Sequence, residues 1–204
     1  RITHDEEVLA AVFSPDGKYV VSGSADGSAY LWEVNTSVKI IYRTDQDWVD
    51  AITLSHDGKY LVSGAFSKAN VWEVTTGEEV ASIANYDSPI TFSLDDKHLV
   101  ASSGYGRINV WETTTGKEIA RMYSDGFVNS IAFSPDGKYI ISGSDDNTVR
   151  IREVSTGLET IRILNESPVL SVDFSSDGKY IASGNNEGVA RVWEVRSGKE
   201  IARM

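Results

Sequence analysis

A chain of 204 residues with 41% hydrophobic and 24% charged residues has the composition of a folded, water-soluble protein. It contains no cysteine, which excludes disulfides and thiolate chemistry, and its formal charge of −11 disfavours nucleic acid as a partner because acidic surfaces repel phosphate backbones. No apolar run could span a membrane and the first residues lack the features of a signal peptide, so we expect a cytoplasmic protein that does not contact a membrane.

The first 43 residues predict a four-stranded antiparallel meander. Short apolar runs at 8–13, 19–24, 29–34 and 38–42 are separated by turn signals. The first turn, Ser14-Pro15-Asp16-Gly17-Lys18-Tyr19, combines a proline that presets φ with a glycine that accepts a left-handed conformation. This turn therefore closes a hairpin between the first two strands.

The same turn returns four times along the chain, led by Ser55, Ser93, Ser134 and Ser175. Four tryptophans keep step with it, Trp32, Trp72, Trp111 and Trp193, and Arg152 takes the place of a tryptophan in the fourth copy. A period of about 40 residues is typical of stacked or radial repeat arrays. The sequence predicts one domain of five units, at 1–43, 44–83, 84–122, 123–163 and 164–204, with third strands at 29–34, 69–74, 108–113, 149–154 and 190–195.

The phrases FSPDGKYIISGSDD at 133–146 and VWEV at 192–195 resemble the WD-repeat (WD40) β-propeller family, in the regular form found in bacterial repeat arrays. In this chain glutamate follows each of these tryptophans, where the family has aspartate. The resemblance covers the whole chain and implies an all-β propeller of five four-stranded antiparallel blades, each with its first strand near the central axis.

The sequence is compatible with three ways of completing the ring of blades. Five blades can close alone, belong to a longer chain, or assemble with another chain, and an unclosed array would expose apolar blade faces that favour self-association. Both ends coincide with repeat boundaries, as expected for a segment of a longer protein. We favour a ring that closes by itself.

The resemblance also implies a hydrogen-bonded network within a blade, and only the first unit has the full set: His4, Ser22, Asp26 and Trp32. By residue type His4, Asp26 and Ser22 resemble a catalytic triad, but a network that links strands explains them better. The run at 145–147 is too short to wrap a cation. We expect no catalytic residue, metal or cofactor.

Candidate partner-binding residues lie in the turns before the first strand and between the second and third strands, which emerge on one face of a propeller. The aromatic candidates are Trp48, Phe66, Tyr86, Tyr105 and Phe127, with Asp50, Asn129 and Asp145 nearby. Exposed aromatic residues dominate binding hot spots, and Trp48 and Phe127 occupy equivalent positions before a first strand. The alternative is that some of these rings, Phe66 and Tyr105 above all, fold inward.

The function that this pattern favours is a non-enzymatic scaffold that binds a protein or peptide. One alternative is the sensing part of a larger bacterial signalling protein, which binds a ligand or trigger while another domain acts. A propeller enzyme is a further alternative, but the residues at the starts of the first strands are too apolar for catalysis.

Overall fold

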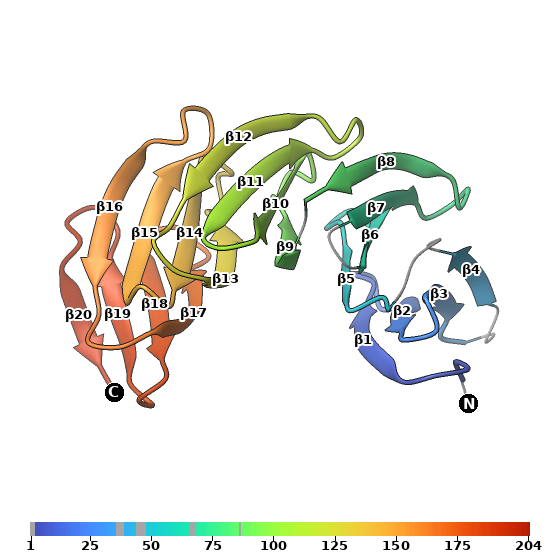
Figure 1. Cartoon of the computed structure of the whole chain (residues 1–204), viewed down its shortest axis with the longest axis horizontal. Helices are drawn as coiled ribbons and strands as arrows, with labels where there is room; N and C mark the ends of the chain where they lie inside the picture. Colours follow the sequence, from blue (N-terminus) through green and yellow to red (C-terminus); the bar gives the residue numbers. More distant parts are fainter. Residues whose placement is uncertain (1–2, 36–38, 44–47, 66–67, 86) are drawn as a thin grey trace. The chain divides into compact units, whose positions relative to one another are not determined.

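The computed structural model describes residues 3–35, 39–43, 48–65, 68–85 and 87–204. These residues form twenty strands and no helix, in five four-stranded antiparallel sheets (Figure 1). Within each sheet, strands adjacent in the chain are adjacent in space, so each sheet is a meander of one repeat. The expected all-β fold of five four-stranded blades is confirmed; we number the blades 1 to 5 in chain order.

The strands of blade 1 are β1 (Val8–Phe13), β2 (Tyr19–Ser24), β3 (Ser28–Glu33) and β4 (Lys39–Arg43). Those of blade 2 are β5 (Ala51–Leu54), β6 (Tyr60–Ala65), β7 (Lys68–Glu73) and β8 (Glu79–Ala84). Those of blade 3 are β9 (Asp87–Phe92), β10 (His98–Ser103), β11 (Arg107–Glu112) and β12 (Glu118–Tyr123). Those of blade 4 are β13 (Val128–Phe133), β14 (Tyr139–Ser144), β15 (Thr148–Glu153) and β16 (Glu159–Leu164). Those of blade 5 are β17 (Val169–Phe174), β18 (Tyr180–Asn185), β19 (Ala190–Glu194) and β20 (Glu200–Arg203).

The chain forms two compact units. The N-terminal unit comprises Arg1–Ser88 with Thr113–Lys117, and therefore contains blades 1 and 2. The C-terminal unit comprises Pro89–Glu112 with Glu118–Met204, and contains the strands of blades 4 and 5 and most of blade 3.

The third strands end one residue earlier than the hydrophobic pattern predicts. In blade 1, Ser28 pairs with Arg43 and so begins β3, whereas Val34, expected inside the strand, follows it. The N–H of Val34 donates to the carbonyl of Lys18 (2.8 Å), across the base of the neighbouring turn. An apolar residue such as Val34 can be the last residue of a strand or the first residue of a turn. The hydrophobic pattern alone therefore could not locate the end of the third strand.

Each hairpin turn is closed by its own serine and aspartate. In the first turn the Ser14 hydroxyl donates to Asp16 Oδ1 (2.7 Å) and accepts from the N–H of Tyr19 (2.9 Å). The bond from Ser14, followed by that from the N–H of Lys18, lowers the pKa of Asp16 from 3.8 to about 2. The turn glycine has φ of 69°, and the third repeat places Asp96 there at 58°. The left-handed position predicted from the sequence is therefore real.

Within each unit, adjacent blades pack face to face. Within the N-terminal unit Val21 and Leu31 of blade 1 join Leu61 and Trp72 of blade 2 in one core. Corresponding cores lie between blades 3 and 4 and between blades 4 and 5. The four repeat tryptophans are 3–8% exposed while the glutamates after them are partly exposed, so these successive side chains of the third strand differ in burial.

Glycine in the second strand allows this close packing. A Cβ atom at Gly23 would lie 2.7 Å from Cγ1 of Val49 and 2.9 Å from its carbonyl oxygen. A Cβ atom at Gly143, the corresponding residue of blade 4, would lie 2.7 Å from Cγ1 of Val169. All three distances are below normal van der Waals contact, so the start of the next blade can approach only because these side chains are absent.

Candidate interaction surface

Two sets of turns form what we call the loop face of each unit. The carbonyl of Glu7, just before β1, accepts from the N–H of Ala25 in the turn after β2 (2.9 Å). Phe127 and Asp145 form the same bond in blade 4 (2.9 Å), as do Pro168 and Asn186 in blade 5 (3.1 Å). The turn before the first strand and the turn between the second and third strands are therefore tied together, as expected.

Trp48 lies on the loop face of the N-terminal unit with 60% of its surface exposed. The next residue, Val49, is fully buried, and its N–H donates to the carbonyl of Ser24 in blade 1 (2.9 Å). Asp50 is exposed, and its N–H donates to the carbonyl of Gly64 (3.1 Å). Trp48 thus projects into solvent from a backbone that is fixed on both blades.

A groove of about 480 Å³ lies beside Trp48. Its lining residues are Glu6, Glu7, Leu9, Ala25 and Trp48. Glu6, Glu7 and Leu9 were not among the residues expected from the sequence. The repeat could have indicated Glu7, because Glu7 and Trp48 hold equivalent positions in consecutive repeats and the equivalent turns of adjacent blades are neighbours. We call this site the Trp48 groove.

A second aromatic site lies on the loop face of the C-terminal unit. The rings of Tyr105 and Phe127 meet edge to face, with centroids 5.0 Å apart, and are 66% and 53% exposed. The Tyr105 hydroxyl donates to the carbonyl of Asp125 (2.7 Å), which ties the turn of blade 3 to that of blade 4. Neither ring folds inward, contrary to the alternative considered for Tyr105.

The polar candidates support this second site. The side-chain amide of Asn129 donates to Asp145 Oδ1 (2.6 Å) and to the carbonyl of Val169 (3.1 Å). Both side chains belong to exposed residues on the same loop face as Phe127. The remaining aromatic candidates, Phe66 and Tyr86, lie outside the described residues.

The four network residues of blade 1 are in contact. His4 Nε2 and the Ser22 hydroxyl are 2.6 Å apart, and that hydroxyl also accepts from the Trp32 indole N–H (3.1 Å). His4 Nδ1 lies 3.5 Å from Asp26 Oδ2, and its ring stacks on Tyr30 at 4.2 Å. Ser22 is only 5% exposed, so its hydroxyl is placed to join strands and not to attack a substrate.

In blade 4, Arg150 and Arg152 take the place of this network. The sequence indicated only that Arg152 replaces the tryptophan. Arg152 is 4% exposed and donates to the Ser142 hydroxyl (3.3 Å), the carbonyl of Tyr123 (2.6 Å) and Glu159 (3.4 Å). Burial, and next the charge of Arg150, lower the pKa of Arg152. Its guanidinium thus lies beside a carboxylate of its own blade.

Arg150 extends the network to the loop face. Its Nη2 lies 2.5 Å from Asp125 and 2.7 Å from Asp146, and its Nη1 lies 3.5 Å from Glu159. The alternation of Arg150 and Arg152 along one strand was the available signal, because it places both on the same side of the sheet.

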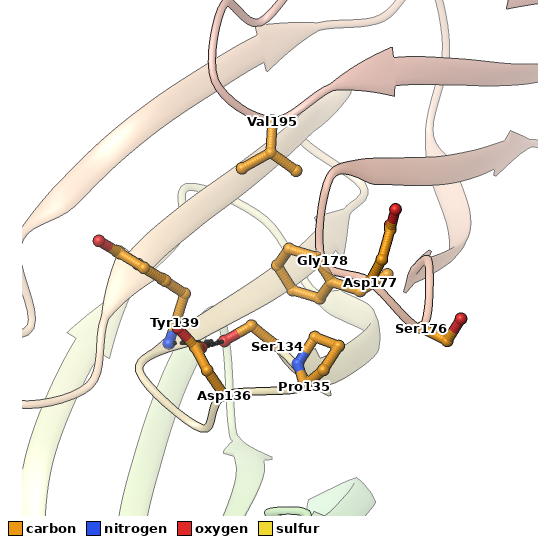
Figure 2. A pocket seen from close by; sticks show the side chains of 9 residues that line it. Ser134, Pro135, Asp136, Tyr139, Ser176, Asp177, Gly178 and Val195 are labelled. Carbon is orange, nitrogen blue, oxygen red and sulfur yellow. Dashed lines mark hydrogen bonds between the residues drawn. The ribbon is translucent and has the colours of Figure 1, made fainter.

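A pocket of about 330 Å³ lies on the opposite face of the C-terminal unit, between the hairpin turns of blades 4 and 5 (Figure 2). Pro135, Tyr139 and Val195 contribute apolar surface to it. Its carboxylates are already engaged, since Asp136 accepts from the Ser134 hydroxyl (2.6 Å) and Asp177 pairs with Lys179 (3.1 Å). These contacts recur in the hairpin turns of other repeats, so they form part of the scaffold.

Comparison with known proteins agrees with the fold. The WD40 family model (WD domain, G-beta repeat) matches residues 1–33, 116–152 and 158–194, more than half of the chain. The chain belongs to the WD-repeat family. Within that family's pattern, blade 1 keeps the complete histidine, serine, aspartate and tryptophan set, whereas blade 4 of this WD-repeat chain uses the arginine network described above.

Two curated relatives are similar over part of the chain. One is the nuclear distribution protein nudF of Emericella nidulans, 29% identical over 89 residues, or 42% of this chain and 20% of that protein. Another is the small ribosomal subunit protein RACK1 of Caenorhabditis elegans, 25% identical over 83 residues, or 41% of this chain and 26% of that protein. The matches thus span about a fifth to a quarter of these relatives.

Two further features of the described residues concern metal ions and membranes. They contain no group of three or more histidine, cysteine, aspartate or glutamate side chains placed to hold a metal ion. No helix in the same residues has the length and apolar character needed to cross a membrane.

Proposed function

We propose that this WD-repeat chain is a non-enzymatic platform that binds a protein or peptide partner on its loop face. The observation that carries the proposal is the exposure of three aromatic rings in the loop-face turns. The four repeat tryptophans are buried, whereas Trp48, Tyr105 and Phe127 are each more than half exposed on backbones held by hydrogen bonds. Rigid exposed aromatic side chains lose little entropy on binding and bury a large apolar area.

The surroundings of these rings support binding. Asp50, Asn129 and Asp145 place polar groups around apolar centres, which is the usual composition of an interface. The hairpin turns carry similar serine and aspartate contacts from repeat to repeat. Specific recognition requires features that differ between repeats, and the loop face supplies them.

The enzyme alternative has little support. Ser22 and its neighbours are buried within blade 1 and hydrogen-bonded to one another. Catalysis would require a nucleophile or an acid and base that a substrate could reach. We therefore assign His4, Ser22, Asp26 and Trp32 to stability.

The test compares the Trp48→Ala/Phe127→Ala double variant with the unmodified chain as bait in a pull-down, followed by affinity measurement on the partner recovered. We expect a loss of at least tenfold in affinity, about 1.4 kcal/mol or more. The melting temperature should stay within about 2 °C, because both rings are exposed.

The matched control is Leu158→Ala, which removes an equally exposed apolar side chain in the turn between β15 and β16, away from the loop face. It should leave affinity unchanged. Unchanged binding by the double variant, combined with a large fall in melting temperature, would show that the two rings are structural and that the wrong face was chosen.

A further inference from the structure

The Trp48 groove combines an indole face with carboxylates. Glu6 and Glu7 line the same groove as Trp48, and both are exposed residues. Leu9, also in the lining, is 42% exposed and adds apolar surface. The groove therefore offers negative charge, a π face and an aliphatic wall together.

The charge of this groove is not balanced within the described part of the chain, where no lysine, arginine or histidine forms an ion pair with Glu6 or Glu7. Several carboxylates elsewhere have such partners. On the hairpin face Asp16 pairs with Lys18 (3.1 Å), and on the loop face of blade 4 Asp146 pairs with Arg150 (2.7 Å). The Trp48 groove thus combines an exposed indole with carboxylates that form no ion pair with the cations that the structure describes.

We infer that the Trp48 groove binds a lysine or arginine side chain presented by an extended peptide. A cation over the indole face gains a cation–π interaction, and the two carboxylates attract the same charge. The methylene stem of the side chain can lie along Leu9, as long basic side chains do on apolar surfaces. An acidic peptide would be repelled, and the net charge of −11 attracts cationic segments from a distance.

This inference rests on the proposed function and adds the chemistry of the partner. A purely apolar side chain would fill the groove equally well without using either carboxylate. The experiment must therefore separate a basic residue from an apolar residue of similar length.

The probes are four acetylated and amidated peptides that differ only in a central residue flanked by leucines: arginine, lysine, norleucine or glutamate. Binding is followed by the indole N–H signals of the protein, among which the Trp48→Ala variant identifies that of Trp48. The arginine and lysine peptides should bind about tenfold more tightly than the glutamate peptide and several-fold more tightly than the norleucine peptide. Raising salt from about 0.05 M to about 0.5 M should reduce this difference.

Two double variants test the carboxylates. Glu6→Gln/Glu7→Gln should bring the arginine and norleucine peptides to within about twofold of each other, because it keeps the shape of the groove and removes its charge. Glu78→Gln/Glu79→Gln removes an adjacent exposed acidic pair of the same unit, outside the lining of the groove, and should leave the preference intact.

Equal binding of the arginine and norleucine peptides by the unmodified chain would overturn the inference, as would absence of any shift of the Trp48 signal at millimolar peptide. Either result leaves the proposed function standing if the Trp48→Ala/Phe127→Ala variant still loses its partner. Conversely, the unmodified chain could select basic peptides while the Trp48→Ala/Phe127→Ala variant keeps its full affinity for the recovered partner. That pair of results would support the inference about the groove and reject the proposed function.

Discussion

Asp26 shows how a single side chain stabilises blade 1. It accepts from the N–H of Asp5 (3.0 Å) and from the N–H (2.9 Å) and hydroxyl (2.5 Å) of Ser28. Desolvation on burial opposes ionisation, but these bonds outweigh it and lower the pKa of Asp26 from 3.8 to about 2. The carboxylate therefore adds stability that is complete above about pH 4 and is lost as the pH falls towards 2.

We expect Asp26→Asn to lower the free energy of unfolding at pH 7 by about 1–3 kcal/mol. If the amide oxygen accepts the bonds from Ser28, the NH2 group of the amide faces the N–H of Asp5, and two donors then meet without an acceptor. The difference from the unmodified chain should shrink between about pH 4 and pH 2. Urea unfolding at several pH values measures it. A difference that stays constant down to pH 2 would show that the charge of Asp26 is not involved.

For Arg152 we predict a substitution that raises the free energy of unfolding. Its charge is buried beside Arg150, whereas blade 5 places Trp193 at the same position, with its indole donating to Ser183 (3.0 Å). Blade 5 also holds Arg191 at the position of Arg150, 5.8 Å from the Trp193 ring, so the two residue types fit together. Arg152→Trp should therefore raise the free energy of unfolding by about 1 kcal/mol, since apolar replacements of buried ion pairs are often stabilising.

Arg152→Ala is the comparison, because it leaves Glu159 with one cation fewer and opens a cavity; it should lower stability by about 3 kcal/mol. Thermal and urea unfolding of both variants measure these changes. A loss of stability in Arg152→Trp as large as that in Arg152→Ala would mean that the arginine network is required and not merely tolerated.

At the scale of strands and turns, the contact between blades depends on glycine. Gly143→Ala should lower stability by about 1–3 kcal/mol, because its Cβ would lie 2.7 Å from Val169 and 3.0 Å from Val172. Gly184 is the corresponding residue of blade 5, where no described atom would lie within 4 Å of a Cβ. If blade 5 is uncovered, Gly184→Ala should be neutral or slightly stabilising; in a ring that closes by itself the first strand of blade 1 would cover Gly184, and the substitution should then destabilise about as much as Gly143→Ala. A Gly143→Ala variant as stable as the unmodified chain would contradict this explanation of the packing.

The sequence was most informative about these elements. The repeated serine, aspartate and glycine residues predict the hairpins because their chemistry is local, and the spacing of the tryptophans predicts the third strands to within one residue. The Trp48 groove and the arginine network were less predictable, since they depend on which side chains of neighbouring turns or strands meet. Glu6 and Glu7 precede Trp48 by some forty residues and join its groove only through the packing of blade 1 on blade 2.

For the molecule as a whole, we propose that residues 1–204 act as one propeller domain that closes by itself. Such a ring should sediment with the mass of a single chain at every concentration. Open blade faces would instead drive association, because apolar area is worth roughly 25 cal/mol per Å² when buried. Sedimentation velocity over a hundredfold range of concentration distinguishes these cases, and a stable dimer or larger species would reject self-closure.

We have proposed that partners bind the loop face. The most direct measurement is hydrogen–deuterium exchange of the chain alone and with the partner recovered by pull-down. We expect slower exchange in the turns around residues 5–7, 48–50, 104–106 and 125–129, and no change in the five hairpin turns led by Ser14, Ser55, Ser93, Ser134 and Ser175. Protection of those hairpin turns, with the loop-face turns unchanged, would contradict binding on the loop face.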